Sequence, residues 1–203
     1  MRTINTTVYF YNELNVNDAA KKNARDWWIK SSHEDDFWQE CVFDDTKAIG
    51  VLMGIEIKNI YFRGFSSQGD GACFEGTWRA DKVQENKVKE YAPKDQELNR
   101  IANEFEKMAK QFPFASFYVK QSGHYYHENC ADFSVAIIDI NGDEIMSAEA
   151  KQAEEILVES AKDFMRWIYK TLEKEYEYQI SEKNVEEIIL ANNYEFTEDG
   201  RVI

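Results

Sequence analysis

The stretch that most constrains the fold runs from Ile60 to Trp78. Two runs of aromatic and β-compatible residues flank a break, Ser66 to Gly71, that reads Ser-Ser-Gln-Gly-Asp-Gly. Glycine adopts the backbone angles of a tight turn at little cost, so this composition is typical of a β-hairpin. We therefore predict a central hairpin over residues 60–79, with positive φ at Gly69 and Gly71.

Periodicity predicts further strands and helices on both sides of this hairpin. A period of two over Thr3–Tyr11 predicts an edge strand, and residues 132–140, which are apolar on both faces, predict an interior strand. Asp81–Lys94 is polar and poorly periodic, and we assign it no structure. The remaining segments are a strand at 114–122, a terminal hairpin at 194–203, and helices at 17–30, 35–53, 95–112, 148–178 and 182–191.

Three residues mark the ends of these helices. Gly54 stands where a left-handed C-cap would end the second helix, Asp95 introduces the third, and Ser147 caps the long helix over 148–178. The fold class is therefore α+β. We expect an antiparallel or mixed sheet of about four to six strands that contains the central hairpin and is packed by several amphipathic helices.

Length and composition indicate a globular protein. A chain of 203 residues with 43% hydrophobic residues is long enough for a sizeable core, and we predict a single domain over residues 1–203. Three cysteines without a C-x-x-C spacing favour reduced thiols. The sequence contains neither a long apolar run nor the apolar region of a signal peptide, so we expect a cytoplasmic protein without a cofactor.

The charge is strongly acidic, since 24 Lys and Arg face 38 Asp and Glu for a net charge of −14. Direct binding to nucleic acid is disfavoured, because it depends on Lys and Arg that neutralise phosphates. A partner with a basic surface is favoured. The solvent face of the second helix is acidic and is commonly only a solvated face, but its candidate binding residues are Asp36, Glu40, Asp44 and Asp45.

The central loop allows two interpretations. Loops that hold phosphate are usually followed by a helix and, in P-loops, by a lysine, whereas a strand follows here. The glycines then serve only the turn, with Gly64 and Gly76 relieving crowding in the strands. The alternative is a polar binding site at the tip of the hairpin, formed by Ser66, Ser67, Gln68 and Asp70.

His124, His127 and Cys130 are the residues whose types favour zinc. Their spacing matches no standard zinc finger, and a fourth ligand, Cys73 or His33, would have to arrive through the fold. We therefore predict no metal site and keep the three residues as weak candidates. The same histidines could act as general bases, but no nucleophile stands in a recognisable motif beside them, so we predict that the protein is not an enzyme.

Asp139–Asp143 imitates the start of a calcium-binding loop. Glu144 takes the place of the glycine at loop position six, and Ala150 takes that of the bidentate acid at position twelve. We predict a turn.

Several motifs together carry a resemblance to a known family. The segments Gly54–Ile57, Tyr61–Gly76, Gly123–His127 and Asn193–Gly200 resemble a family of uncharacterised bacteriophage and prophage proteins, some of which are labelled as antitoxins. The resemblance implies a phage accessory gene. The family carries no reaction that could be transferred to residues of this chain.

Our first hypothesis is a phage-encoded protein that binds and inhibits a host or rival protein, for example in a defence system such as CRISPR. An acidic surface can mimic the charge of DNA and occupy a basic nucleic-acid channel. One alternative is an antitoxin that neutralises a basic toxin; another is a small-molecule or metal binder that uses the loops 66–71 and 124–130. A composite site is expected if these two loops lie at the same end of the sheet.

Overall fold

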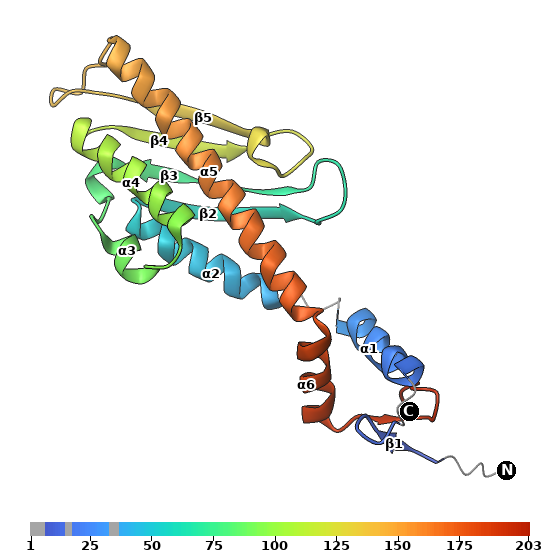
Figure 1. Ribbon diagram of the computed structural model, residues 1–203. Coiled ribbons are helices and arrows are strands. Elements are labelled where there is room, and N and C mark those ends of the chain that lie inside the picture. Colours follow the sequence, from blue (N-terminus) through green and yellow to red (C-terminus); the bar gives the residue numbers. More distant parts are fainter. Residues whose placement is uncertain (1–6, 15–17, 33–36) are drawn as a thin grey trace. The chain divides into compact units, whose positions relative to one another are not determined.

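The computed structural model describes residues 7–14, 18–32 and 37–203 (Figure 1). Contacts divide the chain into two compact units. We call Cys41–Glu173 the sheet unit, and Met1–Glu40 together with Lys174–Ile203 the terminal unit. The predicted α+β class is confirmed, because helices accompany two antiparallel sheets in the described residues. The single domain was inferred from chain length and stays a prediction.

The sheet unit contains a four-stranded antiparallel sheet with the order β2-β3-β4-β5. Its strands are β2 Ile55–Arg63, β3 Gly71–Arg79, β4 Ser116–Gln121 and β5 Ala131–Ala136. The predicted central hairpin is confirmed as β2 and β3, which pair from Ile55 opposite Trp78 to Arg63 opposite Gly71, with a shift of register by one residue between Ile57 and Asn59.

The predicted interior position of the strand at 132–140 is wrong, because β5 lies at the edge of the sheet and β4 lies inside it. The apolar residues of its second face do not face a neighbouring layer. Ala136 is exposed, and Ile140, beyond the end of the strand, is 79% exposed. A sequence that is apolar on both faces predicted burial, but no helix among the described residues of the sheet unit covers the second face.

Helices cover one face of the sheet (Figure 1). They include α4 Gln96–Gln111, much of the long helix α5 Ala148–Gln179, and α2 Phe37–Leu52. The core between the layers is aromatic, since fully buried Trp78 packs against Phe105 and Phe117 with ring centroids 5.7 Å apart in both pairs. The Trp78 indole N–H donates to the Met53 carbonyl at 2.9 Å, which satisfies both groups in this core.

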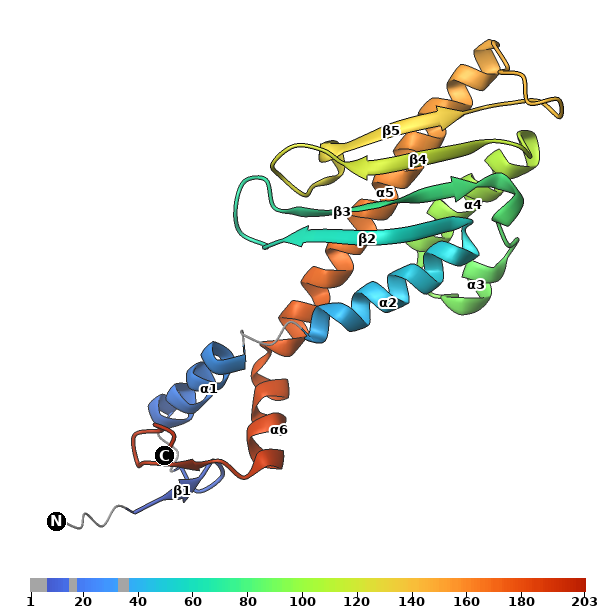
Figure 2. The ribbon, with the colours of Figure 1, turned by 180° about the vertical axis from the view of Figure 1, so that it is seen from behind.

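Within the described residues of the sheet unit, no helix covers the opposite face of the sheet, as the view from behind shows (Figure 2). Along β4, buried Phe117 and Val119 alternate with exposed Tyr118 and Lys120. This period of two is expected of an antiparallel sheet with one solvated face.

The predicted helix ends are confirmed. Gly54 follows α2 with φ +81°, the Asp95 carboxylate accepts from the Leu98 N–H at 2.9 Å, and the Ser147 hydroxyl accepts from the Ala150 N–H at 3.1 Å. The unassigned segment forms a 3-10 turn, Ala80–Lys82, and the short helix α3 Lys87–Tyr91.

The terminal unit contains α1 Asp18–Ser32, α6 Glu182–Asn192 and a pair of short antiparallel strands, β1 Tyr9–Phe10 and β6 Glu195–Phe196. Its aromatic core includes Trp27, whose ring lies 5.1 Å from that of Tyr194 and 5.9 Å from that of Phe196. The predicted terminal hairpin is confirmed by the bridge between Phe196 and Val202. The edge strand predicted over Thr3–Tyr11 is found as β1, but β1 pairs with β6 in a separate two-stranded sheet rather than in the main sheet; the start of its predicted range lies outside the described residues.

Candidate functional site

The two hairpin loops of the sheet unit meet at one end of the sheet (Figures 1 and 2). They are residues 64–70 between β2 and β3, and residues 122–130 between β4 and β5. A Cβ atom built on Gly69 would overlap the ring of Tyr125, and one built on Gly71 would lie 2.6 Å from the Cα of His127. The two loops are therefore in direct contact and form one composite surface, which we call the loop pair.

The Asp70 side chain holds the first loop in shape through hydrogen bonds within the loop. One oxygen of its carboxylate accepts from the backbone N–H groups of Ser66 at 2.8 Å and Ser67 at 2.6 Å. The Asp70 N–H donates in turn to the Ser67 carbonyl at 3.1 Å. Of the four residues predicted to bind at the tip, Ser66, Ser67 and Gln68 are exposed, whereas Asp70 is committed to the shape of the loop.

The glycines of this loop have different roles. Gly69 has φ +89°, which confirms the prediction of positive φ at this position. The same prediction for Gly71 is wrong, since Gly71 is not among the residues with positive φ. Its lack of a side chain serves the close approach of His127 instead. In β3, a Cβ on Gly76 would collide with the Glu56 carbonyl, which confirms that this glycine relieves crowding between strands.

The second loop is held by side chains at its base. The Gln121 amide donates to the carbonyls of Gly123 at 3.0 Å and Tyr125 at 3.2 Å. The ring of Tyr126 stacks on that of Tyr61 from β2, with centroids 5.6 Å apart. Tyr125 stacks on His127 and is 44% exposed. The loop therefore presents an aromatic ring whose position is fixed from several sides.

Glu75 holds Tyr61, one of the two rings in the stack with Tyr126, in place. Its carboxylate accepts from the Asn59 amide at 3.1 Å and from the Tyr61 hydroxyl at 2.9 Å. The hydrogen bonds from Asn59 and Tyr61 lower the pKa of Glu75, and the bond to Glu75 raises the pKa of Tyr61. The carboxylate therefore stays ionised and the phenol stays protonated, which preserves the hydrogen bond between them.

His127 and Cys130 are brought together, with 3.4 Å between the ring Nε2 and the sulfur. The Asn129 N–H donates to His127 Nδ1 at 3.1 Å, so a neutral ring carries its proton on Nε2. In this tautomer Nε2 donates toward the sulfur and cannot accept the thiol proton. The pair therefore does not have the arrangement of a cysteine nucleophile with a histidine base.

The other weak metal candidates do not complete a ligand set. The ring of His124 lies against Tyr125, with centroids 5.3 Å apart. Cys73 is buried, and burial is the main factor that raises its pKa to about 12, so its thiol stays protonated. His33 lies outside the described residues. Among the described residues, no group of three His, Cys, Asp or Glu side chains could hold a metal ion.

The predicted turn at Asp139 is confirmed. Its carboxylate accepts from the N–H groups of Asn141 at 2.8 Å and Asp143 at 3.0 Å, and these bonds lower its pKa. Gly142 has φ +87°.

Three of the four acidic candidates lie on α2, away from the loop pair in sequence. Glu40, Asp44 and Asp45 are exposed, and Asp36 lies outside the described residues. Asp45 accepts a hydrogen bond from the Tyr91 hydroxyl, and Asp44 lies 3.7 Å from the Lys47 ammonium. Asp44 and Asp45 thus interact with Lys47 and Tyr91, which are not residues of the loop pair.

Sequence reasoning missed the residues that hold the loop pair in shape. Asn59, Glu75 and Gln121 are polar residues on three different strands, so no local pattern in the sequence connects them. Tyr125 lies against Gly69 of the first loop, and nothing in the sequence of its own hairpin indicates this contact. Glycines at 69 and 71 are compatible with another segment lying close to the backbone, but they do not indicate that this segment is residues 122–130.

The sequence also matches the model of one protein family. DUF8835, described as a domain of unknown function, matches residues 38–182. The chain belongs to this family. The DUF8835 match spans the whole sheet, both loops and α5. Searches of curated proteins and of solved structures find no match. Among the described residues, no helix has the length and apolar character needed to cross a membrane.

Proposed function

We propose that this DUF8835 member is a phage-encoded accessory protein that binds and inhibits a host or rival protein, and that the loop pair recognises this partner. The convergence of the two loops is the observation that carries the proposal. The resemblance of the sequence to bacteriophage and prophage proteins supports the phage origin, and a bacterial defence protein is the target we favour.

The chemistry of the loop pair suits protein recognition. Exposed Ser66, Ser67 and Gln68 lie beside half-exposed Tyr125, and surfaces that bind proteins commonly combine tyrosine with small polar residues. The bonds to Asp70 and the contact of Gly71 with His127 fix the loops before any partner arrives. A preformed surface loses less conformational entropy on binding, which favours affinity.

Charge favours a basic partner. The net charge of −14 attracts cationic surfaces at long range, and the exposed acids Glu40, Asp44 and Asp45 add to this field. Such charges accelerate association and are screened by salt, whereas short-range contacts set specificity. In this proposal the loop pair supplies specificity and the acidic surface supplies attraction.

Affinity capture from phage-infected cells with the tagged full chain tests the proposal. The first variant changes Ser66, Ser67 and Gln68 to alanine and keeps Asp70, so that the loop retains its internal hydrogen bonds. The second reverses the charges of Glu40 and Asp44. We expect the loop variant to lose the partner at every salt concentration and the charge variant to lose affinity mainly at low salt.

The results separate the possible functions. Failure of the wild-type chain to retain any specific protein contradicts the binding proposal, and full retention by the loop variant contradicts the role of the loop pair. Thermal unfolding of each variant should match the wild type, because exposed side chains contribute little to stability. Recovery of a small basic toxin would identify an antitoxin rather than a defence inhibitor.

A further inference from the structure

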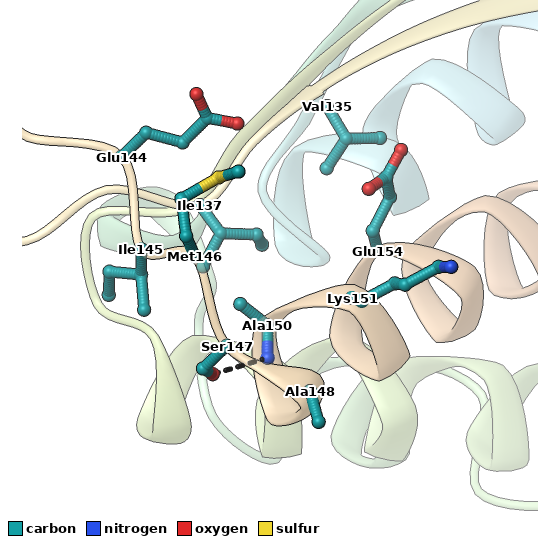
Figure 3. Close-up of a pocket in the computed structure, with 10 residues that line it drawn as sticks. All are labelled: Val135, Ile137, Glu144, Ile145, Met146, Ser147, Ala148, Ala150, Lys151 and Glu154. Atoms are coloured by element: carbon teal, nitrogen blue, oxygen red, sulfur yellow. Dashed lines mark hydrogen bonds between the residues drawn. The ribbon is translucent and has the colours of Figure 1, made fainter.

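A second surface lies at the other end of β5, where the chain turns into α5. Here a hollow of about 440 Å³ opens between the end of the strand and the first turns of the helix (Figure 3). Its apolar lining is Val135, Ile137, Ile145, Met146, Ala148 and Ala150. The side chain of Met146 is 87% exposed. A second hollow of about 370 Å³ shares Lys151 and Glu154 with the first and continues along α5 to Glu159. We call the two hollows together the α5 groove.

The α5 groove adjoins a free sheet edge. β5 is the last strand in the order β2-β3-β4-β5, so one edge of residues 131–136 has no strand partner in the part of the chain that the structure describes. Just beyond the strand, the Ile145 N–H donates to the Ile137 carbonyl at 2.9 Å. The returning chain thus pairs briefly with the continuation of β5 before it begins α5 at Ala148. Unpaired edges accept an added strand, and apolar pockets beside them take alternate side chains of that strand.

The charges on the groove select its occupant. Glu144 and Glu154 line the first hollow, and Glu154, Glu155 and Glu159 line the second. Lys151 is the one cation in either lining, and Arg166 forms an ion pair with Glu159. A second copy of the same edge would set these acids against each other, which is unfavourable. A segment that carries Lys or Arg would be attracted.

The start of α5 disfavours a carboxylate in the groove. The Ser147 hydroxyl already accepts from the Ala150 N–H. Hydrogen bonds from its own N–H and from the Ser147 hydroxyl lower the pKa of Glu149. A negative charge therefore already occupies the helix N-terminus, so a chain-terminal carboxylate would gain little there.

We propose that the α5 groove binds an extended internal segment of a partner protein that alternates basic and apolar residues. The segment adds a strand to the free edge of β5. One apolar side chain enters the hollow beside Val135 and Met146, and the basic side chains project from the other face of the added strand, on the side of Glu144, whose bridge partner is Ile138. This surface is separate from the loop pair, and the inference does not rest on the proposed function.

Peptide titration of the full chain tests the inference. The probes are peptides of about eight residues that alternate Lys or Arg with Val, Ile, Leu or Phe, and a matched set carries Glu in place of the basic residues. NMR of the backbone amides should show the basic peptides shifting signals of residues 131–137 and 144–151. The acidic set should bind at least tenfold more weakly, since its charges oppose those of the groove.

Four variants locate the site, and two of them form a matched pair. Ala148→Trp places a large ring in the hollow from an exposed position, and it should weaken binding at least tenfold. Met146→Ser should weaken binding, whereas Ile140→Ser removes an equally exposed apolar side chain outside the hollow and should not. The loop variant with alanine at Ser66, Ser67 and Gln68 should bind the basic peptides as the wild type does.

Four outcomes of the peptide titration overturn the inference. These are no binding of the basic peptides at millimolar concentration, equal binding of the acidic set, wild-type affinity in Ala148→Trp, and shifts confined to residues outside β5 and the groove. A dimer that forms with increasing protein concentration and is lost in Ala148→Trp would also overturn it, by making a second copy the occupant.

Discussion

Replacement of Gly71 by alanine tests the contact on which the loop pair depends. Gly71 lies in β3 without positive φ, so its backbone conformation suits any residue. In the absence of a neighbour, Gly→Ala within a strand stabilises by about 0.5–1 kcal/mol through lower entropy of the unfolded chain. The sign of the change in unfolding free energy therefore reports whether a neighbour is present.

The structure predicts the opposite sign. The added Cβ would lie 2.6 Å from the Cα and Cβ of His127 and 3.1 Å from its backbone nitrogen. Carbon atoms in contact prefer about 3.5–4.0 Å, so the loop at 122–130 must move by roughly 1 Å. Such overpacking costs about 1–3 kcal/mol, which leaves a net destabilisation of about 1–2 kcal/mol.

Hydrogen exchange in increasing urea measures the unfolding free energy from the amides of β3 and β4, so that the sheet unit is observed by itself. Gly142→Ala is the control, because Gly142 has φ +87° and no neighbour within 4 Å of the added Cβ. The control should lose about 1–2 kcal/mol from backbone strain alone, without faster exchange in either loop. Stabilisation by Gly71→Ala, or unchanged exchange in residues 122–130, would refute the contact and with it the composite surface.

Three further outcomes follow from the same structure. Trp78→Phe should destabilise the sheet unit by about 1–3 kcal/mol in urea unfolding, because it leaves the Met53 carbonyl buried without its donor. Asp70→Ala should speed amide exchange in the first loop about tenfold, the equivalent of about 1.4 kcal/mol, with little change in global stability, while Asp70→Asn keeps an acceptor and should be intermediate. Burial, with a hydrogen bond to Glu186, raises the pKa of Tyr11 to about 12, so the folded terminal unit binds more protons than the unfolded chain above pH ~10. Its stability should fall as pH rises from about 10 to 12, and the unfolding free energy of Tyr11→Phe should lack that component of the fall.

Local signals predicted much of the secondary structure. Asp95 and Ser147 cap helices through their own side chains, and Gly54 ends a helix through its own φ, so each requires only a few neighbouring residues. The partner of a strand is not local in this sense. A period of two predicted strands near Tyr9 and at residues 132–140, but it could not place β1 beside β6 or β5 at the edge of the sheet.

The candidate site was predicted in part. The composition of the two loops indicated their exposed polar residues, but their convergence depends on the directions of four strands, which the undefined segment Asp81–Lys94 left open. Asp70 was grouped with Ser67 and Gln68 as a binding residue. An aspartate that follows two serines in a turn is also well placed to accept their backbone N–H groups, and the structure assigns it that role.

The terminal unit has a consequence for synthesis of the chain. Its two parts are separated by the entire sheet unit, and Tyr9 pairs with Phe196. On the ribosome, Tyr11, Leu14 and Trp27 emerge long before Phe196 is translated, so their apolar surfaces stay uncovered while the contiguous sheet unit is able to fold. A folded sheet unit would then shorten the flexible connection that must close, which lowers its entropic cost. Chaperones or aggregation would act in that interval, and mutations that slow folding of the sheet unit would prolong it.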